Sequence, residues 1–140
     1  MKNFFVCLSC VAAVMSPGAM AQTDKGAAMP DCASVATQAQ MNECAYEDFL
    51  AATAAYAASY RTISDRLGSH QKDHFRRTQK LWIQYRTAAC NFESSSVEGG
   101  SARGMVKSRC DARMTRARTA ELDVLANCNE GDLSCPRFRK

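Results

Sequence analysis

Residues 37–67 decide the fold, and they read TQAQMNECAYEDFLAATAAYAASYRTISDRL. The segment contains no glycine or proline, and alanine is its commonest residue. Its larger side chains return every three or four residues, so they share one face of a helix. That face is formed by Tyr46, Phe49, Leu50, Thr53, Tyr56, Ala57, Tyr60, Ile63 and Leu67. The pattern predicts one long helix that ends at Gly68.

Two further helices are predicted after this segment. Residues 71–92 carry the apolar positions Phe75, Leu81, Trp82, Tyr85, Ala88, Ala89 and Phe92. Residues 102–127 carry Met105, Val106, Cys110, Met114, Ala117, Leu122 and Leu125. Because only a short Gly68-Ser69 turn joins the first two helices, we expect them to form an antiparallel hairpin. No segment alternates as a strand does, so the predicted class is all-α, a long hairpin plus a third helix.

The first 22 residues have the pattern of a secretory signal. Lys2 precedes an apolar stretch at residues 4–15, and Ala19-Met20-Ala21 forms a small-x-small cleavage site. Cleavage after Ala21 leaves 119 of the 140 residues and lowers the formal charge from +4 to +3, because Lys2 is removed. The apolar stretch is too short to span a bilayer. We therefore expect a periplasmic or secreted protein with no membrane span and no nucleic-acid partner.

Four segments follow from this pattern. Residues 1–21 are the predicted signal peptide, 22–31 a flexible lead-in, 32–127 the helical domain and 128–140 a disulfide-closed basic tail. Cys7 and Cys10 leave with the signal, since they lie within its apolar stretch. A lipoprotein signal is disfavoured because the apolar stretch before Cys10 is too short.

The mature chain keeps six cysteines, an even number that predicts three disulfides in an exported protein. Six cysteines allow 15 connectivities. Pairing by reach gives Cys32–Cys44, Cys90–Cys110 and Cys128–Cys135. A structural zinc site is the alternative, but no C-x-x-C pair survives signal cleavage.

Three stretches together resemble the LprI-like lysozyme-inhibitor N-terminal domain family of bacterial envelope proteins. The first runs from Cys32 through Gln40-Met41-Asn42-Glu43-Cys44-Ala45 toward Tyr60. The second contains Gln79, Trp82, Tyr85, Arg86 and Cys90, in the spacing Q-x-x-W-x-x-Y-R-x-x-x-C. The third contains Gly99-Gly100-Ser101, Cys110, Thr115, Arg118 and Leu122. The resemblance covers about residues 32–125 and implies a small helical, disulfide-held envelope domain that inhibits lysozyme.

Several conspicuous side chains have a structural and a functional interpretation. Trp82 and Tyr85 lie in the apolar line of the second predicted helix, so core packing is favoured. For Arg86 we favour a bridge across the helix interface to a carboxylate such as Glu47, over an anionic partner. His70 and His74 have a spacing that can hold zinc, but a third ligand is not apparent, so a solvated helix start is favoured.

Two surfaces are candidates for partner binding. The loop at residues 91–101 carries Glu93, Ser94, Ser95 and Glu98, and the Cys90–Cys110 bond restrains both of its flanks. Acidic and hydroxyl groups on a restrained loop suit entry into a glycosidase cleft, although a plain helix connection is an equal interpretation. The third helix is basic, and Arg113 and Arg116 are its candidates for an anionic partner. A solvated face is the favoured interpretation of this helix, over a dedicated binding surface.

Catalysis has little support, since we find no nucleophile elbow, phosphate loop, readable carboxylate pair or cofactor motif. We expect a non-enzymatic protein that binds a protein partner. The resemblance favours a lysozyme as that partner, and the alternative is an adaptor or immunity-type protein with a different macromolecular partner. A charge of +3 provides no long-range attraction to the many basic lysozymes.

Overall fold

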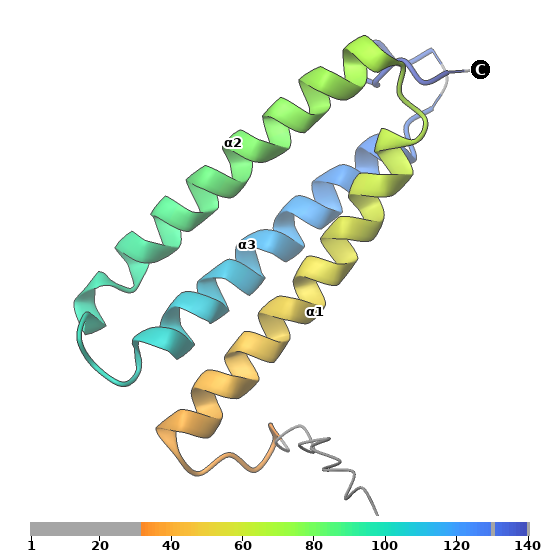
Figure 1. The fold of residues 1–140 in the computed structure, drawn as a ribbon. Helices are drawn as coiled ribbons and strands as arrows, with labels where there is room; N and C mark the ends of the chain where they lie inside the picture. The colour runs from red at the N-terminus through yellow and green to blue at the C-terminus, as the bar shows by residue number, and fades with distance from the viewer. Residues whose placement is uncertain (1–31, 130, 140) are drawn as a thin grey trace, which may run out of the picture.

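The computed structural model describes residues 32–129 and 131–139. These contain α1 (Gln38–Ser64), α2 (Ser69–Glu93), the short 3₁₀ helix η1 (Ser95–Val97) and α3 (Arg103–Ala126). Successive helices alternate in direction, so α1 and α3 run parallel and α2 runs antiparallel to both (Figure 1). The described residues contain no strand beyond an isolated bridge between Leu67 and Phe138. The all-α class and the hairpin-plus-helix arrangement are confirmed.

The helix boundaries follow local capping chemistry. Thr37 and Gln40 form a reciprocal capping box at the start of α1. At the other end of α1, the prediction that the helix ends at Gly68 is wrong, because α1 ends at Ser64 with Asp65 as its C-cap. The chain tightens into a turn in which the amide of Leu67 donates to the Ser64 carbonyl. Gly68 then precedes α2 as its N-cap.

The backbones of α1 and α3 approach each other most closely, as Figure 1 shows. Small side chains permit this approach, since Ala45 and Ala52 on α1 and Ala112 on α3 are all buried. Asn42 of α1 also caps α3, because its Oδ1 accepts from the Met105 amide at 3.0 Å. This contact supplies the cap that Ala102, the N-cap residue of α3, lacks.

Aromatic rings hold α2 further from α1. Tyr56 stacks on Trp82 at a centroid distance of 5.3 Å, and Tyr60 stacks on Phe75 at 5.1 Å. The core of the described residues lies where α1 ends and α3 finishes. Its buried members are Tyr56, Ile63, Leu67 and Leu122, and Phe75, Trp82, Leu125, Ala126 and Phe138 pack against them.

All three predicted disulfides are present. Cys32–Cys44 joins the chain before α1 to that helix, and Cys90–Cys110 joins the end of α2 to α3. Cys128–Cys135 closes a loop in the tail. The tail then returns to the α1–α2 turn, where the Arg66 guanidinium lies 3.7 Å from the Phe138 ring centroid.

The close α1–α3 contact leads to a stability prediction. Ala112 is fully buried, so replacing it with leucine should overpack the interface and lower the free energy of unfolding by about 2 kcal/mol. Urea unfolding monitored by circular dichroism measures the effect. Ala117→Leu is the matched control because Ala117 lies on the exposed side of α3. Equal losses in the two variants would contradict this account of the interface.

Candidate functional site

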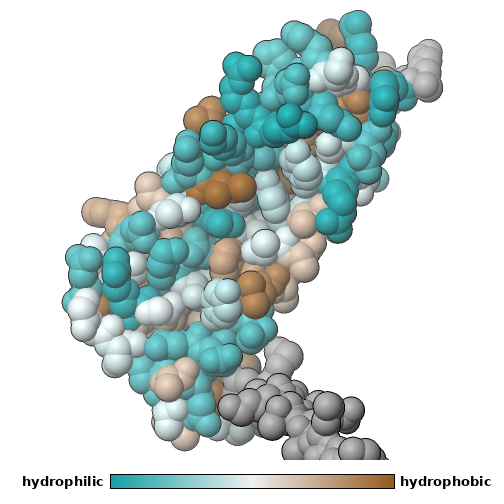
Figure 2. Space-filling model, viewed as in Figure 1, coloured by the Kyte–Doolittle hydropathy of each residue, from teal (hydrophilic) through white to brown (hydrophobic). Residues whose placement is uncertain are grey.

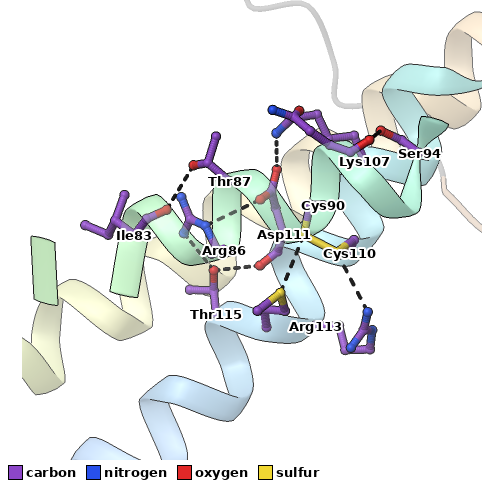
Figure 3. Close-up of polar contacts among 12 residues, drawn as sticks. Ile83, Arg86, Thr87, Cys90, Ser94, Lys107, Cys110, Asp111, Arg113 and Thr115 are labelled. Carbon is purple, nitrogen blue, oxygen red and sulfur yellow. Dashed lines mark hydrogen bonds and ion pairs between the residues drawn. A yellow bond between two sulfur atoms is a disulfide. The ribbon is translucent and has the colours of Figure 1, made fainter. Parts of the chain in front are cut away.

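Arg86 is held inside the molecule by contacts from all three helices. Its side chain is only 13% exposed, and its Nε lies 3.4 Å from Asp111 Oδ1. A second guanidinium nitrogen donates to Thr115 Oγ1 at 2.9 Å (Figure 3). The guanidinium also lies 5.0 Å from the ring centroid of Phe49 and 5.3 Å from that of Trp82. These contacts make Arg86 part of the scaffold and leave it poorly placed to meet a partner.

The carboxylate that meets Arg86 is Asp111, so the suggestion of Glu47 is wrong. Arg86 lies one turn before Cys90, and Asp111 directly follows Cys110. The Cys90–Cys110 disulfide therefore places the two charged groups opposite each other. Asp111 also accepts from Lys107 Nζ at 2.6 Å, which places two cations on one buried carboxylate (Figure 3).

A second polar cluster lies further along the interface. Gln79 Oε1 accepts from Arg118 Nε at 3.1 Å and from the Tyr56 hydroxyl at 3.3 Å. Burial raises the pKa of the Tyr56 hydroxyl above its usual value of 10.0. The hydroxyl therefore stays protonated and able to donate at physiological pH. Gln79 and Arg118, which belong to two of the sequence motifs, are thus hydrogen-bonded to each other between α2 and α3.

Tyr85 is exposed, which makes the prediction that it packs in the core wrong. Its exposed fraction is 65%, and those of Leu81 and Phe92 on the same helix are 59% and 81%. The inward side of α2 is defined by Gln79, Trp82, Arg86 and Cys90. The exposed side chains form a second row, which we call the outer α2 row: Leu81, Tyr85, Ala88 and Phe92. A large exposed apolar row is a feature of interaction surfaces.

The segment after α2 contains the short helix η1 and a buried serine. Ser94 is fully buried, and its hydroxyl donates to the Asn91 carbonyl at 3.2 Å. Ser94 is therefore not available as a surface contact. Ser95 is exposed and donates to the Phe92 carbonyl at 2.7 Å. The 3₁₀ helix η1 fills the middle of the segment.

Each charged residue predicted as a partner contact in this loop or on α3 forms an ion pair within the chain. Glu93 accepts from Arg113 at 2.6 Å, and Glu98 lies 3.4 Å from Arg103. Arg116 pairs with Asp48 of α1, and this hydrogen bond raises the pKa of the Arg116 guanidinium. The pairs offset much of the positive charge that the sequence assigned to the face of α3. All of these side chains remain partly exposed.

Comparison with known families decides the affiliation of the chain. The family model described as "Lysozyme inhibitor LprI" matches residues 28–122. This chain belongs to the LprI family. An uncharacterized protein of Rhizobium meliloti (strain 1021) is 32% identical over 114 residues, which cover 72% of this chain and 82% of that protein. No solved structure matches the chain.

In this LprI-family chain, most motif residues serve the fold. Gln79, Trp82, Arg86 and Cys90 face inward from α2, and their partners on α3 include Cys110, Thr115 and Arg118. Tyr85 is the exception within the α2 motif. Sequence reasoning missed the outer α2 row because it merged two faces of α2 into one apolar line. The spacing 81, 85, 88, 92 is the signal that separates the rows, since these steps keep one helix face.

The structure also bears on the metal, membrane and signal features considered for this LprI-family chain. The rings of His70 and His74 are 4.6 Å apart at the start of α2. Within the described ranges, no group of three histidine, cysteine or acidic side chains is arranged to hold a metal. None of the described helices is both long and apolar enough to cross a membrane. The predicted signal peptide and lead-in lie outside the described residues.

Proposed function

We propose that this chain is exported after cleavage at Ala21 and binds a lysozyme, blocking its muramidase activity without catalysing a reaction itself. The family description supports the partner class. The single observation that carries the contact surface is the outer α2 row, which exposes Leu81, Tyr85 and Phe92 to solvent. This row runs directly into the restrained loop between α2 and α3.

The loop suits entry into a cleft because its base is rigid. Cys90 and Cys110 are both buried and bonded, and the Glu93–Arg113 ion pair lies beside them. Restraint lowers the entropy lost on binding. Ser95 and the carboxylate of Glu98 are the exposed polar groups that we assign to the contact.

This geometry assigns different roles to the two parts of the surface. A muramidase cleft contains a catalytic acid and a second carboxyl group. The Ser95 hydroxyl donates to the Phe92 carbonyl, and its oxygen can still accept a hydrogen bond from the protonated catalytic acid. Tyr85 and Phe92 provide the larger contribution, since a few aromatic anchors dominate most interfaces. Because these anchors are uncharged, we expect inhibition to change little with salt concentration.

Substitutions in the outer α2 row test the proposal. Tyr85→Ser and Phe92→Ser should each weaken inhibition of muramidase turnover by about tenfold or more, since a well-packed aromatic anchor contributes at least 1–2 kcal/mol. Val124→Ser is the control, because Val124 is 70% exposed but lies on α3 outside the row. The assay uses purified, oxidised mature protein and a panel of lysozymes.

Two outcomes would reject the proposal. One is the absence of both inhibition and a complex on sizing columns at micromolar concentrations. The other is salt-sensitive capture of a different envelope partner that is weakened by charge reversal at Arg113 and Arg116. That result would favour an adaptor or immunity-type protein.

A further inference from the structure

A shallow groove runs between α1 and α2, and its lining comes only from these two helices. Its apolar part is formed by Tyr56, Ala57, Tyr60 and Ile83. Ile83 is 40% exposed, so part of this lining is open to solvent. The space-filling view shows separate apolar patches over α1 and α2 surrounded by hydrophilic residues (Figure 2). The groove is distinct from the outer α2 row, which lies on another face of the helix.

Cationic side chains lie along one edge of the groove. Arg76 and Lys80 both contribute to its lining, and no acidic residue does. Arg76 approaches Asp73 at 3.4 Å, but both side chains are 67% exposed. Such an exposed pair is weak and can open easily. Lys80 has no acidic partner in the part of the chain that the structure describes. The charge at this edge therefore complements an anion.

Gln79 also lines the groove but is only 3% exposed. Its oxygen accepts from Arg118 and Tyr56, and its nitrogen Nε2 has almost no exposed surface. The surface that the groove offers to a ligand is therefore apolar, with the two cationic side chains at its edge.

We propose that this groove binds a free single-chain amphiphile with a carboxylate head. The carboxylate lies at Lys80 and Arg76, and the hydrocarbon chain packs on Tyr56 and Ile83. Along α2 the lining extends from Arg76 to Gln84, a rise of about 12 Å. That length suits a medium chain. The site is independent of the lysozyme contact.

The sole tryptophan of the chain provides a direct readout. Trp82 stacks on Tyr56, a residue that lines the groove. Octanoate and decanoate, each below its critical micelle concentration, should change Trp82 fluorescence in a saturable manner with one molecule bound per chain. Affinity should rise about fourfold for each added methylene. Decanol, which lacks the charge, should bind about tenfold more weakly than decanoate, since each exposed ion pair contributes up to about 1 kcal/mol.

Matched variants locate the binding site. Lys80→Gln should weaken decanoate binding about threefold to fivefold and leave decanol binding unchanged. Ile83→Asn should weaken both ligands at least tenfold because it removes apolar contact. Arg77→Gln and Leu81→Asn are the controls, since both residues lie on α2 outside the groove lining. Circular dichroism verifies that each variant is folded.

Three results would overturn the proposal. The first is the absence of saturable decanoate binding. The second is a loss of affinity in the control variants equal to that in the groove variants. The third is association only with micelles or with phosphatidylglycerol vesicles in a flotation assay, which would indicate a lipid-surface contact.

Discussion

Replacing both Cys90 and Cys110 with alanine should lower the free energy of unfolding by about 3 kcal/mol, as expected for a crosslink that closes a loop of this length. The bond joins residues 20 apart in sequence, and both cysteines are almost fully buried. A typical domain is stable by only about 5–15 kcal/mol, so this loss is a large share. Urea unfolding of the mature protein measures it.

The tail disulfide is the matched control for this prediction. Cys128 and Cys135 are only seven residues apart, so their bond should contribute about 1 kcal/mol less by the same relation. A larger loss from Cys128→Ala/Cys135→Ala would contradict this ordering. Removing the Cys90–Cys110 bond should also weaken muramidase inhibition, because the loop would lose the restraint at its base.

Removing the buried carboxylate of Asp111 should destabilise the protein at least as much as removing the Cys90–Cys110 disulfide. Asp111→Ala should lower the free energy of unfolding by about 3–5 kcal/mol, since Arg86 would be left buried without its counter-ion. Lys107 can turn toward water because its side chain is 34% exposed, whereas that of Arg86 is 13% exposed. The loss is therefore expected to come mainly from Arg86.

A double-mutant cycle tests this mechanism. Asp111→Ala combined with Arg86→Met should destabilise the protein by less than the sum of the single changes, because the unpaired cation is absent. Glu93→Ala is the control for a surface pair. It breaks a contact with an Arg113 side chain that is 63% exposed, so it should lower stability by less than about 1 kcal/mol. Similar losses from Asp111→Ala and Glu93→Ala would contradict the assigned role of burial.

Most of the fold could be predicted from local patterns in the sequence. The apolar periodicity of residues 37–67 and the absence of helix breakers predicted α1, and short separations predicted the three disulfides. The error at Gly68 arose because a glycine near a helix end is often taken as the residue after the C-cap, whereas here α1 ends at Ser64 and a turn then buries Leu67 in the core. The local sequence around Gly68 does not show that Leu67 will be buried in the core.

The candidate site was harder to predict for a related reason. Tyr85 and Trp82 are three residues apart and both aromatic, yet one is exposed and the other packs against the core. Ser94 looked like a loop hydroxyl but is fully buried. Glu93, Arg113 and Arg116 looked like free charges, but each has an ion-pair partner elsewhere in the chain. Only the relative positions of the helices distinguish these cases.

By itself, the sequence determined an all-α, three-disulfide chain of the LprI family, because helix periodicity and cysteine spacing are local properties. The tertiary structure decided which face of α2 is buried, that Asp111 is the partner of Arg86, and that α3 packs most closely against α1. These features depend on side-chain size and on contacts between residues far apart in the chain. Small residues bring α1 and α3 together, while aromatic rings hold α2 away, and this arrangement exposes both the outer α2 row and the α1–α2 groove.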